Sequence, residues 1–544
     1  MLKYEGVIIF ALLLLFFVPS IWAAASFDGD WVGGFERPES RVFVHTHFGA
    51  ANDGTTGTID VIDLAINTRP MGKPPVIDPR FGYPINTQLM GKPLDKLELN
   101  PSRVHFELAD KASQLSFEGQ VTNGVMTGLV EDRGKKFPFR LDFVIKIDPS
   151  RYTGIYHVGS GHFIRIGPDI VSLFSFDTQS GQLRFLLPRT EADFVCGPGA
   201  KAYPVQATIH FTTNQLGRVT AMQWKEETAP ALVGTPIKEL QEEEVSFKNG
   251  ETTLSGTLVL PPTKGPHPAV VLVHGAGPGI RSNFRFLADF FALNGVAALM
   301  YDKRGCGTST GDWRKSGFDD FAGDALAGLE LLKNRPDINP HQIGLWGVSQ
   351  GGWIVGLAAS RSTNVAFIIS VSGPGITPEA QGVVAVEHWM KAAGFSETDL
   401  REARSLYLLN SRCTRTDSGW DEFEAVRKAA QNKPWYNANP YLGCCASGAE
   451  KQWQLIWDYD PVPALRKVYC PVLSIFGELD SLVPAQKSAD IWKTALTEAG
   501  NQDVVIKIVP HADHGIADTR NWITLPDFFT LQRDWLLKHV TVNY

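Results

Sequence analysis

The feature that most constrains the fold is a regular alternation, in the second half of the chain, between short apolar runs and helix-length segments. The runs are continuous rather than alternating in polarity, so both faces of each predicted strand must be buried. They span residues 268–273, 296–301, 343–348, 366–371, 471–476 and 504–509. This pattern predicts an α/β domain over residues 245–544, in which helices cover both faces of a mostly parallel sheet and a hairpin over 245–260 leads into it.

The first half of the chain shows strand-like alternation and predicts small, mostly-β domains. Residues 26–148 hold short strands with polar turns, and Thr122-Asn123-Gly124 is a hairpin signal. Residues 149–226 continue the pattern and predict a second small β unit. Residues 227–244 are polar and acidic and are interpreted as a linker. At roughly 100–200 residues per domain, a chain of 544 residues has room for one or two such domains before the α/β domain.

The amino-terminal segment has the pattern of a secretory signal peptide. Lys3 precedes an apolar run from Val7 to Trp22, and Ala23-Ala24-Ala25 supplies a cleavage site. We therefore expect residues 1–25 to be removed and the mature protein to be exported, either periplasmic or secreted. The alternative is an uncleaved membrane anchor, although 16 apolar residues fall just short of a full span. No second apolar run is long enough to cross a bilayer.

Charge, cysteines and histidines exclude some classes of function. The net charge is −7 and no long run of Lys or Arg occurs, which argues against a nucleic-acid partner. The six cysteines show no zinc-type pairing; Cys413 could form a disulfide with Cys444 or Cys445, or all six could be buried thiols. His45 and His47 share one face of a strand, but without a third ligand nearby two ordinary strand histidines are favoured over a metal site. No metal or other cofactor is expected.

The motif with the clearest chemistry is Gly347-Val348-Ser349-Gln350-Gly351, a G-x-S-x-G sequence. A strand-like run precedes it and a helix-like segment follows, which is the context in which this motif forms a tight turn. Such a turn projects the serine oxygen clear of the sheet, and glycines are needed where the strand and helix backbones converge. Ser349 is therefore the candidate nucleophile.

A second motif predicts groups that stabilise negative charge. The loop from His274 to Gly279 reads H-G-A-G-P-G and follows an early strand. A loop at this place supplies one backbone N–H of an oxyanion hole, and the residue after the nucleophile supplies the other. These donors are assigned to Ala276 and Gln350, with a plain structural turn as the alternative. His274 is interpreted as a residue that shapes the loop.

A serine nucleophile needs a base, and the base needs an orienting acid. Asp480 lies just past the end of the run at 471–476, where ligand sites of parallel sheets occur, and Glu478 is the alternative acid. His514 follows the last apolar run and is the candidate base, with His511 as its competitor. The spacing of the two histidines could suggest a metal site, but no carboxylate partner accompanies them.

Between the second run and the next helix lies a glycine-rich loop, Tyr301–Trp313. It lacks the G-x-x-x-x-G-K-[ST] pattern of a phosphate-binding loop. We interpret it as a rigid loop beside the site, held by Asp302 and Arg304, with direct contact to substrate as the minor alternative. Cys306 stands in it where an apolar residue would be expected.

Taken together, the motifs H-G-A-G-P, Y-D-K-R-G-x-G-x-S-x-G, G-x-S-Q-G-G and G-E-x-D-x-x-V-P support a family resemblance. Residues 245–544 resemble bacterial exported serine hydrolases of the α/β-hydrolase superfamily, similar to serine aminopeptidases, dienelactone hydrolases and prolyl-oligopeptidase-like enzymes. The resemblance implies an α/β-hydrolase fold and a triad of Ser349, Asp480 and His514. It does not decide between ester and peptide substrates.

An insertion of about 100 residues separates the fourth and fifth apolar runs, far longer than an ordinary loop. Residues 379–409 and 420–431 within it are helix-like, and aromatic residues follow. We expect a helical cap over about 376–465 that acts as a lid and sets substrate shape; a plain packed insertion is the alternative.

The resulting prediction is a serine hydrolase, a carboxylic ester hydrolase that forms an acyl-enzyme on Ser349. One alternative is an aminopeptidase or dipeptidyl peptidase with the same triad, and another is a catalytically inactive binding protein. The expected partner is a small-molecule ester or a short peptide. No stable membrane span is expected after signal cleavage, and the oligomeric state stays open.

Overall fold

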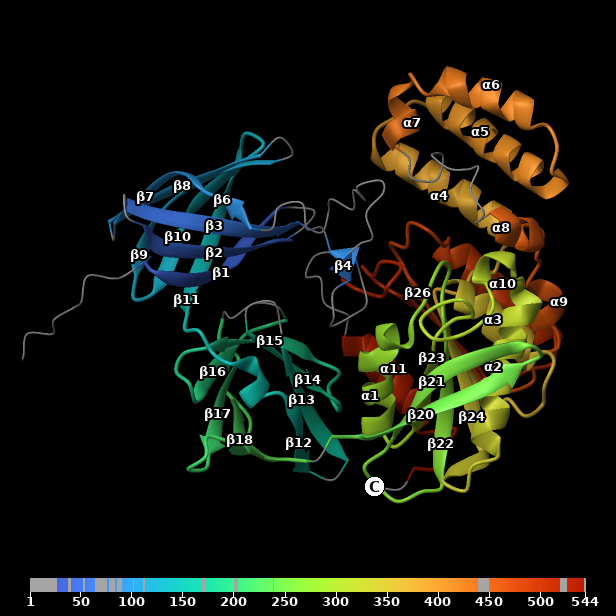
Figure 1. The fold of residues 1–544 in the computed structure, drawn as a ribbon, viewed down its shortest axis with the longest axis horizontal. Coiled ribbons are helices and arrows are strands. Elements are labelled where there is room, and N and C mark those ends of the chain that lie inside the picture. The colour runs from blue at the N-terminus through green and yellow to red at the C-terminus, as the bar shows by residue number, and fades with distance from the viewer. Residues whose placement is uncertain are drawn as a thin grey trace, which may run out of the picture.

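The computed structural model arranges the chain as an amino-terminal sheet, a closed barrel and a larger α/β part that carries a group of helices (Figure 1). The described residues are 27–37, 41–51, 54–63, 76–77, 84–85, 91–100, 102–110, 113–159, 161–168, 172–199, 204–237, 239–438, 450–518 and 526–542. The predicted signal peptide, residues 1–25, lies outside them, so its cleavage and the export of the protein stay predictions. Within the described part of the chain, no helix is both long and apolar enough to cross a membrane.

The first domain is an antiparallel sheet in the order β6-β3-β2-β1-β11-β10-β9-β8-β7. Its strands are β1 (Gly29–Glu36), β2 (Arg41–Ala51), β3 (Gly54–Asp63), β6 (Lys92–Pro93), β7 (Asp95–Asn100), β8 (Arg103–Asp110), β9 (Ser113–Thr122), β10 (Val125–Asp132) and β11 (Lys135–Val144); β4 (Val76–Ile77) and β5 (Pro84–Ile85) form a separate ribbon. The predicted hairpin is confirmed, because Asn123 and Gly124 take positive φ angles of 53° and 73° between β9 and β10. One face of the sheet holds an aromatic core that includes Phe106 and Phe117.

The second domain is a closed barrel of strands β12 to β19. Its strands are β12 (Gly154–Gly159), β13 (His162–Pro168), β14 (Leu173–Asp177), β15 (Leu183–Pro188), β16 (Asp193–Cys196), β17 (Ala207–Thr213), β18 (Val219–Glu226) and β19 (Leu232–Pro236), preceded by the 3-10 turn η1 (Pro149–Arg151). Side chains such as Tyr152, Phe194 and Phe211 fill its interior. The outer face of the first sheet packs against it, where Phe43 meets Phe185.

The prediction of a linker over residues 227–244 is wrong. Strand β19 lies within that segment and closes the barrel by pairing with both β18 and β12. The next strand, β20, already begins at Gln241. Only Gly234 of β19 is buried, and the half-buried Leu232 and exposed Val233 beside it do not form the alternating apolar pattern that would reveal a strand in the sequence.

The third domain confirms the predicted α/β architecture. Its sheet has the order β20-β21-β23-β22-β24-β25-β26-β27, with β22 to β27 parallel and β20 and β21 as the leading hairpin. The strands are β20 (Gln241–Asn249), β21 (Thr252–Leu260), β22 (His267–Val273), β23 (Ala297–Tyr301), β24 (Ile338–Val348), β25 (Ile368–Val371), β26 (Val472–Gly477) and β27 (Val504–Val509). All six apolar runs are parallel strands of this sheet.

Helices cover both faces of this sheet, as continuous apolar strands require. On one face lie α1 (Arg285–Leu293) and α11 (Pro526–Leu536); on the other lie α2 (Phe318–Lys333), α3 (Gln350–Ala359) and α10 (Ala485–Glu498). Two short 3-10 turns, η2 (Arg281–Phe284) and η3 (Trp313–Lys315), complete the loops. Neighbouring residues of β22 alternate between the two cores, since Val270 packs on the α1 side and Val271 on the α2 side.

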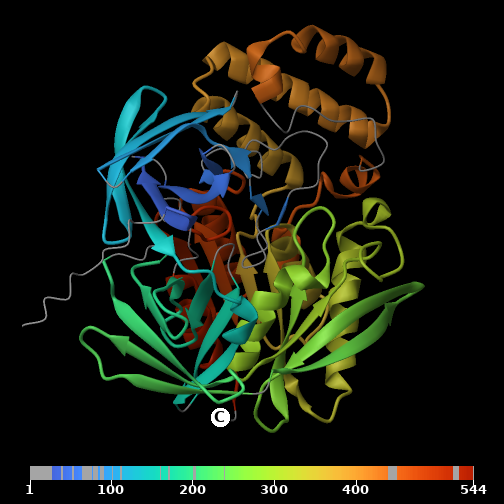
Figure 2. The same ribbon diagram turned by 60° about the vertical axis from the view of Figure 1, so that its left-hand side comes forward.

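The insertion between β25 and β26 is helical, as predicted, and its helices α4 to α7 stand apart from the sheet as a separate layer (Figures 1 and 2). It comprises α4 (Pro378–Ala392), α5 (Glu397–Thr416), α6 (Trp420–Ala430), α7 (Pro434–Ala438), α8 (Glu450–Ile456) and α9 (Val462–Leu465). The helix expected over 379–409 is interrupted, because Gly394 has a φ of 76° and Ser396 caps a new helix through its contact with Asp399. Cys413 is a free buried thiol; its two candidate partners, Cys444 and Cys445, lie outside the described residues.

An aromatic cluster joins the barrel to the α/β domain. Phe176 of β14 contacts Phe286 and Phe529 with ring-centroid distances of 4.9 and 4.8 Å, and lies 6.1 Å from Phe290. Phe286 and Phe290 belong to α1 and Phe529 to α11. The two domains therefore share one apolar core.

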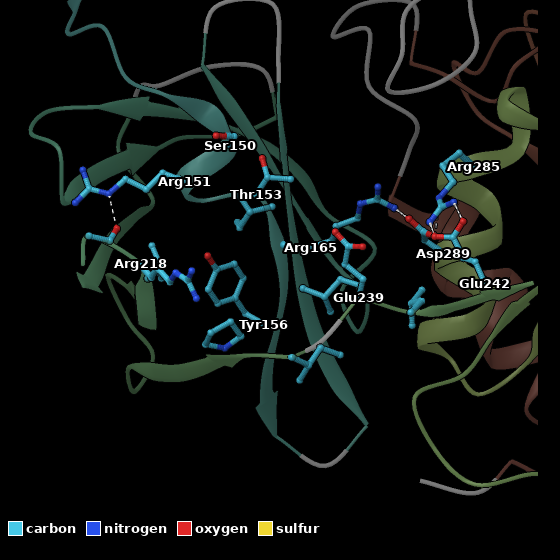
Figure 3. A pocket seen from close by; sticks show the side chains of 18 residues that line it. Ser150, Arg151, Thr153, Tyr156, Arg165, Arg218, Glu239, Glu242, Arg285 and Asp289 are labelled. Atoms are coloured by element: carbon cyan, nitrogen blue, oxygen red, sulfur yellow. Dashed lines mark hydrogen bonds and ion pairs between the residues drawn. The ribbon is translucent and has the colours of Figure 1, made fainter. Parts of the chain in front are cut away.

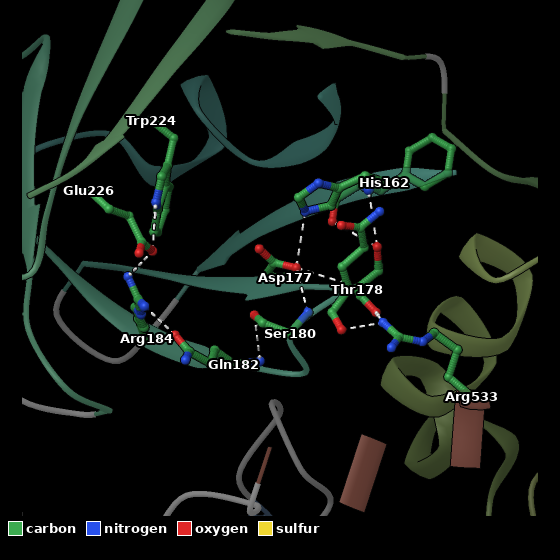
Figure 4. Close-up of polar contacts among 11 residues, drawn as sticks. His162, Asp177, Thr178, Ser180, Gln182, Arg184, Trp224, Glu226 and Arg533 are labelled. Atoms are coloured by element: carbon green, nitrogen blue, oxygen red, sulfur yellow. Dashed lines mark hydrogen bonds and ion pairs between the residues drawn. The ribbon is translucent and has the colours of Figure 1, made fainter. Parts of the chain in front are cut away.

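Polar contacts fix the same junction (Figure 4). Asp177 accepts a hydrogen bond from His162 at 3.1 Å and from two backbone N–H groups of the turn after β14. The turn presents its carbonyls to Arg533 of α11, whose guanidinium donates to Thr178 O at 3.0 Å. Arg165 of β13 also forms an ion pair with Asp289 of α1. The barrel is thus docked on the helices that cover one face of the sheet.

Phe176→Ala should destabilise the protein by about 3–5 kcal/mol, the usual cost of emptying a large aromatic site in a core. The Phe176 side chain is only 1% exposed and bridges two domains. Denaturant unfolding would measure the loss, with Leu216→Ala on the same barrel as control, since Leu216 is 81% exposed and should change stability by less than about 0.5 kcal/mol. Equal effects of the two substitutions would contradict a shared core.

Candidate active site

Ser349 lies in the sharp turn between β24 and α3. Its backbone has φ 54° and ψ −119°, a conformation that non-glycine residues rarely adopt. The turn is held by the Ser349 N–H, which donates to Val371 O at 2.8 Å. A Cβ on Gly347 would lie 2.3 Å from Gly351 O, and one on Gly351 would lie 2.6 Å from Val273 O, so the motif needs both glycines. The predicted strand–turn–helix context of Ser349 is present.

Asp480 and His514 form a hydrogen-bonded pair. They follow β26 and β27, and Nδ1 of His514 lies 2.7 Å from Oδ2 of Asp480. The Asp480 side chain is fully buried, and its other oxygen accepts the N–H groups of Leu482 at 2.8 Å and Val483 at 2.9 Å. Burial of the imidazole acts to lower the His514 pKa, but the charge and hydrogen bond of Asp480 outweigh it and raise the pKa above 6.5.

Adjacent strand ends bring these groups to one edge of the sheet. Val348 of β24 pairs with Val371 of β25, so Ser349 and Ser372 begin neighbouring loops. Ser372 Oγ donates to the backbone oxygen of His514 at 2.8 Å, which ties the histidine loop to the end of β25. Ser349, Ser372 and the Asp480–His514 pair therefore follow four successive parallel strands.

The alternative residues take other roles. Glu478 accepts the backbone N–H of His511 at 2.9 Å, so these two residues interact without a side-chain pair. His511 is exposed and has a φ of 60°. Asp513 accepts backbone N–H groups of its own turn. Of the acids and histidines proposed from the sequence, the structure pairs Asp480 with His514.

The loop from His274 to Gly279 is shaped from within by its histidine. His274 is buried, and its Nε2 donates to Tyr301 O at 2.6 Å. Burial lowers the His274 pKa to about 4, so the ring is neutral. A Cβ on Gly279 would lie 2.5 Å from the ring, which explains the glycine. These contacts agree with the prediction that His274 shapes the loop.

Comparison with known proteins shows which family this part of the chain is similar to. The family model described as "Serine aminopeptidase, S33" matches residues 264–519, which span the sheet from β22 to β27 and the insertion. The C-terminal domain has the α/β-hydrolase fold.

Several known proteins are similar to part of this chain. Esterase EstD of Thermotoga maritima is 26% identical over 279 residues, which are 49% of this chain and 60% of EstD. The quorum-quenching protein AidA of Acinetobacter baumannii is 30% identical over 132 residues, 23% of this chain and 42% of AidA. The chain thus spans less than two thirds of these relatives. The crystal structure of the α/β hydrolase GrgF from Penicillium is 20% identical, with 55% of this chain and 99% of GrgF covered at a TM-score of 0.37.

The glycine-rich loop after β23 is held as predicted by Asp302 and Arg304. Asp302 accepts the N–H of Arg281 at 2.8 Å and that of Thr308 at 3.0 Å. Arg304 forms a buried bidentate pair with Asp324 of α2, at 2.8 and 2.6 Å. The loop is therefore fixed to the hydrolase domain at both ends.

Lys303, which lies between Asp302 and Arg304, was not predicted from the sequence as a functional residue. Lys303 is only 2% exposed, and its Nζ donates to Gly275 O at 2.9 Å, Gly277 O at 3.1 Å and Gln350 Oε1 at 3.0 Å. It therefore joins the loop after β22 to the first residue of α3. The sequence does contain a signal for it. The charged triplet Asp302-Lys303-Arg304 directly follows the buried strand β23, where an unpaired cation is unexpected.

The histidines of the first domain lie in a separate cluster. His45 lies between Asp30 and Asp60, with both contacts at 2.9 Å, and His47 lies 3.0 Å from Asp30. Burial opposes protonation, but the two carboxylates raise the His45 pKa to about 9. Within the described residues, no group of three or more His, Cys, Asp or Glu is arranged to hold a metal ion.

A cavity of about 480 Å³ lies between the barrel and α1 (Figure 3). Within its lining, Arg165 of the barrel pairs with Asp289 of α1 across the junction, and Arg285 of α1 pairs with Glu242 of β20 inside the α/β domain. None of the proposed triad residues lines it. The cavity is part of the domain junction and is remote in the sequence from the loops around Ser349.

Proposed function

We propose that the protein is a serine hydrolase that cleaves a carboxylic ester through an acyl-enzyme on Ser349. The observation that carries the proposal is the 2.7 Å contact between His514 and a buried Asp480, at the same edge of the sheet where β24 presents Ser349 in a strained turn. This is the arrangement by which an acid orients a base toward a serine. Similarity to an esterase and to a family model of serine aminopeptidases supports hydrolysis.

In the proposed mechanism, His514 takes the proton of Ser349 Oγ while that oxygen bonds to the acyl carbon of the ester. The carbonyl electron pair moves onto its oxygen, which the N–H groups of Ala276 and Gln350 stabilise. As the pair returns, the bond to the leaving alkoxide breaks and His514 gives it the proton. Water then repeats the sequence on the acyl-enzyme and releases the acid.

The charge distribution of the cap favours an ester over a peptide with a free amino terminus. An aminopeptidase needs a carboxylate to hold the substrate ammonium group. Five carboxylates of the cap already have cationic partners, in the pairs Glu379–Arg415, Glu387–Arg404, Glu402–Lys433, Glu422–Arg412 and Glu424–Arg427. Glu379 lies in the first turn of α4, directly after the loop that leaves β25. Because Arg415 already pairs with Glu379, this carboxylate is less suited to hold a substrate ammonium group.

An aminopeptidase is the second candidate, because the matching family model carries that description. The two functions can be separated with three methyl esters: alanine, N-acetylalanine and propionate. We expect the ester without an amino group and the acetylated ester to be cleaved at least as well as alanine methyl ester. An aminopeptidase would prefer the free amine by roughly 30-fold or more, the effect of about 2 kcal/mol from a buried charge pair. Peptide mapping after fluorophosphonate labelling should place the label on Ser349.

A further inference from the structure

The ammonium group of Lys303 is a buried charge held by oxygen atoms of neutral groups. Within the part of the chain that the structure describes, no ion pair involves Lys303; its polar partners are the three oxygens named above, and the face of Phe321 lies 4.6 Å from Nζ. The nearby carboxylates are engaged elsewhere: Asp324 by Arg304 and Asp302 by backbone N–H groups. Burying an unpaired cation is costly, so its place in the site calls for a function.

The contacts of Lys303 connect it to both proposed oxyanion donors. In a trans peptide the carbonyl and the N–H point in opposite directions. The Gly275 oxygen that accepts from Lys303 belongs to the peptide whose N–H is that of Ala276. The Ala276 N–H therefore points away from the ammonium group. The third contact is the side chain of Gln350, whose backbone N–H is the other proposed donor.

We propose that Lys303 is a positioning residue for the oxyanion hole: its ammonium group orients and polarises the Gly275–Ala276 peptide and anchors Gln350. This inference rests on the proposed function of Ser349. The positive charge on the carbonyl side increases the partial positive charge of the Ala276 N–H, and it acts in a medium of low dielectric constant. The benefit grows as the substrate oxygen becomes negative, so Lys303 stabilises the tetrahedral intermediate more than the bound ester.

The decisive comparison is between wild type and Lys303→Met, which keeps the length and the apolar stem but removes the charge. We expect kcat to fall by roughly 10- to 100-fold, less than or similar to the loss of one direct oxyanion donor, while KM changes by less than about twofold. Affinity for a trifluoromethyl ketone, which places an oxyanion in the hole, should fall by the same factor as kcat/KM. Lys248→Met, on the exposed edge strand β20, is the control and should match wild type.

A second variant and a pH profile keep the test independent of folding defects. Gln350→Met removes one of the three contacts and leaves the Gln350 N–H, so it should lower kcat and ketone affinity together by a smaller factor. Burial lowers the Lys303 pKa to about 7, so wild-type kcat should decline as the pH rises through about 7 and the ammonium group loses its proton. Cys306, Asp324 and His274 interact electrostatically with Lys303 and remain in the variant. The decline should nevertheless disappear in Lys303→Met.

Each contrary result has a distinct meaning. Turnover that depends on Ser349 but is unchanged in kcat and ketone affinity by Lys303→Met and Gln350→Met would overturn the role of Lys303 alone. A fall in kcat without a matching fall in ketone affinity, or an alkaline decline that persists in Lys303→Met, would also overturn it. Wild-type turnover that does not depend on Ser349 would overturn the proposed function and this inference together.

Discussion

Ser349→Ala is expected to lower kcat for ester hydrolysis by about 10⁶-fold and to abolish labelling by a fluorophosphonate. The variant loses the only atom that bonds to the acyl carbon in the proposed mechanism, while Asp480 and His514 keep their contact. Steady-state kinetics and gel fluorescence of the purified protein would measure both effects. The residual rate should be that of water attack assisted by the remaining groups.

The substitution should leave the fold intact. Ala has no more bulk than Ser, and the turn is held by the backbone bond from residue 349 to Val371 and by the two glycines around it. Ser405→Ala is a matched control, since Ser405 is exposed on α5 in the cap and should keep full activity. Labelling or turnover that survives in Ser349→Ala would assign the nucleophile to another residue.

The parts of the fold that could be predicted from the sequence are those in which burial alone decides residue type. Val270 and Val271 are both apolar because they face two different cores, and such runs mark all the parallel strands. Strand β19 was missed because it is held by backbone pairing to β18 and β12, with Gly234 as its one buried residue. A barrel closes by pairing between strands that lie far apart in the sequence. Such pairing leaves little trace in the local pattern of polar and apolar residues.

The candidate site likewise has parts that could be predicted from the sequence and parts that could not. The rule that functional groups follow strand ends led to Ser349, Asp480 and His514 as candidates, and the structure brings the last two within 2.7 Å. The same rule could not separate His514 from His511, since both follow β27; the orientation of the loop decides which ring meets Asp480. Lys303 was not predicted as part of the site because its contacts come from the loop after β22 and from α3, far apart in the sequence.

His514→Ala is expected to lower kcat/KM for ester hydrolysis by about 10⁴- to 10⁶-fold, because Ser349 then lacks a base. His511→Ala is the matched control: it removes an imidazole in the same loop, three residues away. The His511 ring is exposed and its link to Glu478 is made by the backbone N–H, so activity should stay within about twofold of wild type. The reverse pattern, with His511→Ala inactive and His514→Ala active, would show that the base is His511.

The pH profile gives an independent check on the same residue. A base must be neutral to accept a proton, so kcat/KM should rise with pH as His514 loses its proton. Asp480 raises the pKa of His514 above 6.5, so the midpoint of that rise should lie above the value of a free histidine. Asp480→Asn removes the charge that stabilises the imidazolium and should move the midpoint to lower pH while reducing kcat by about 10⁴-fold. A midpoint that stays unchanged in Asp480→Asn would mean that the titrating group is not paired with Asp480, and the proposed triad would then be wrong.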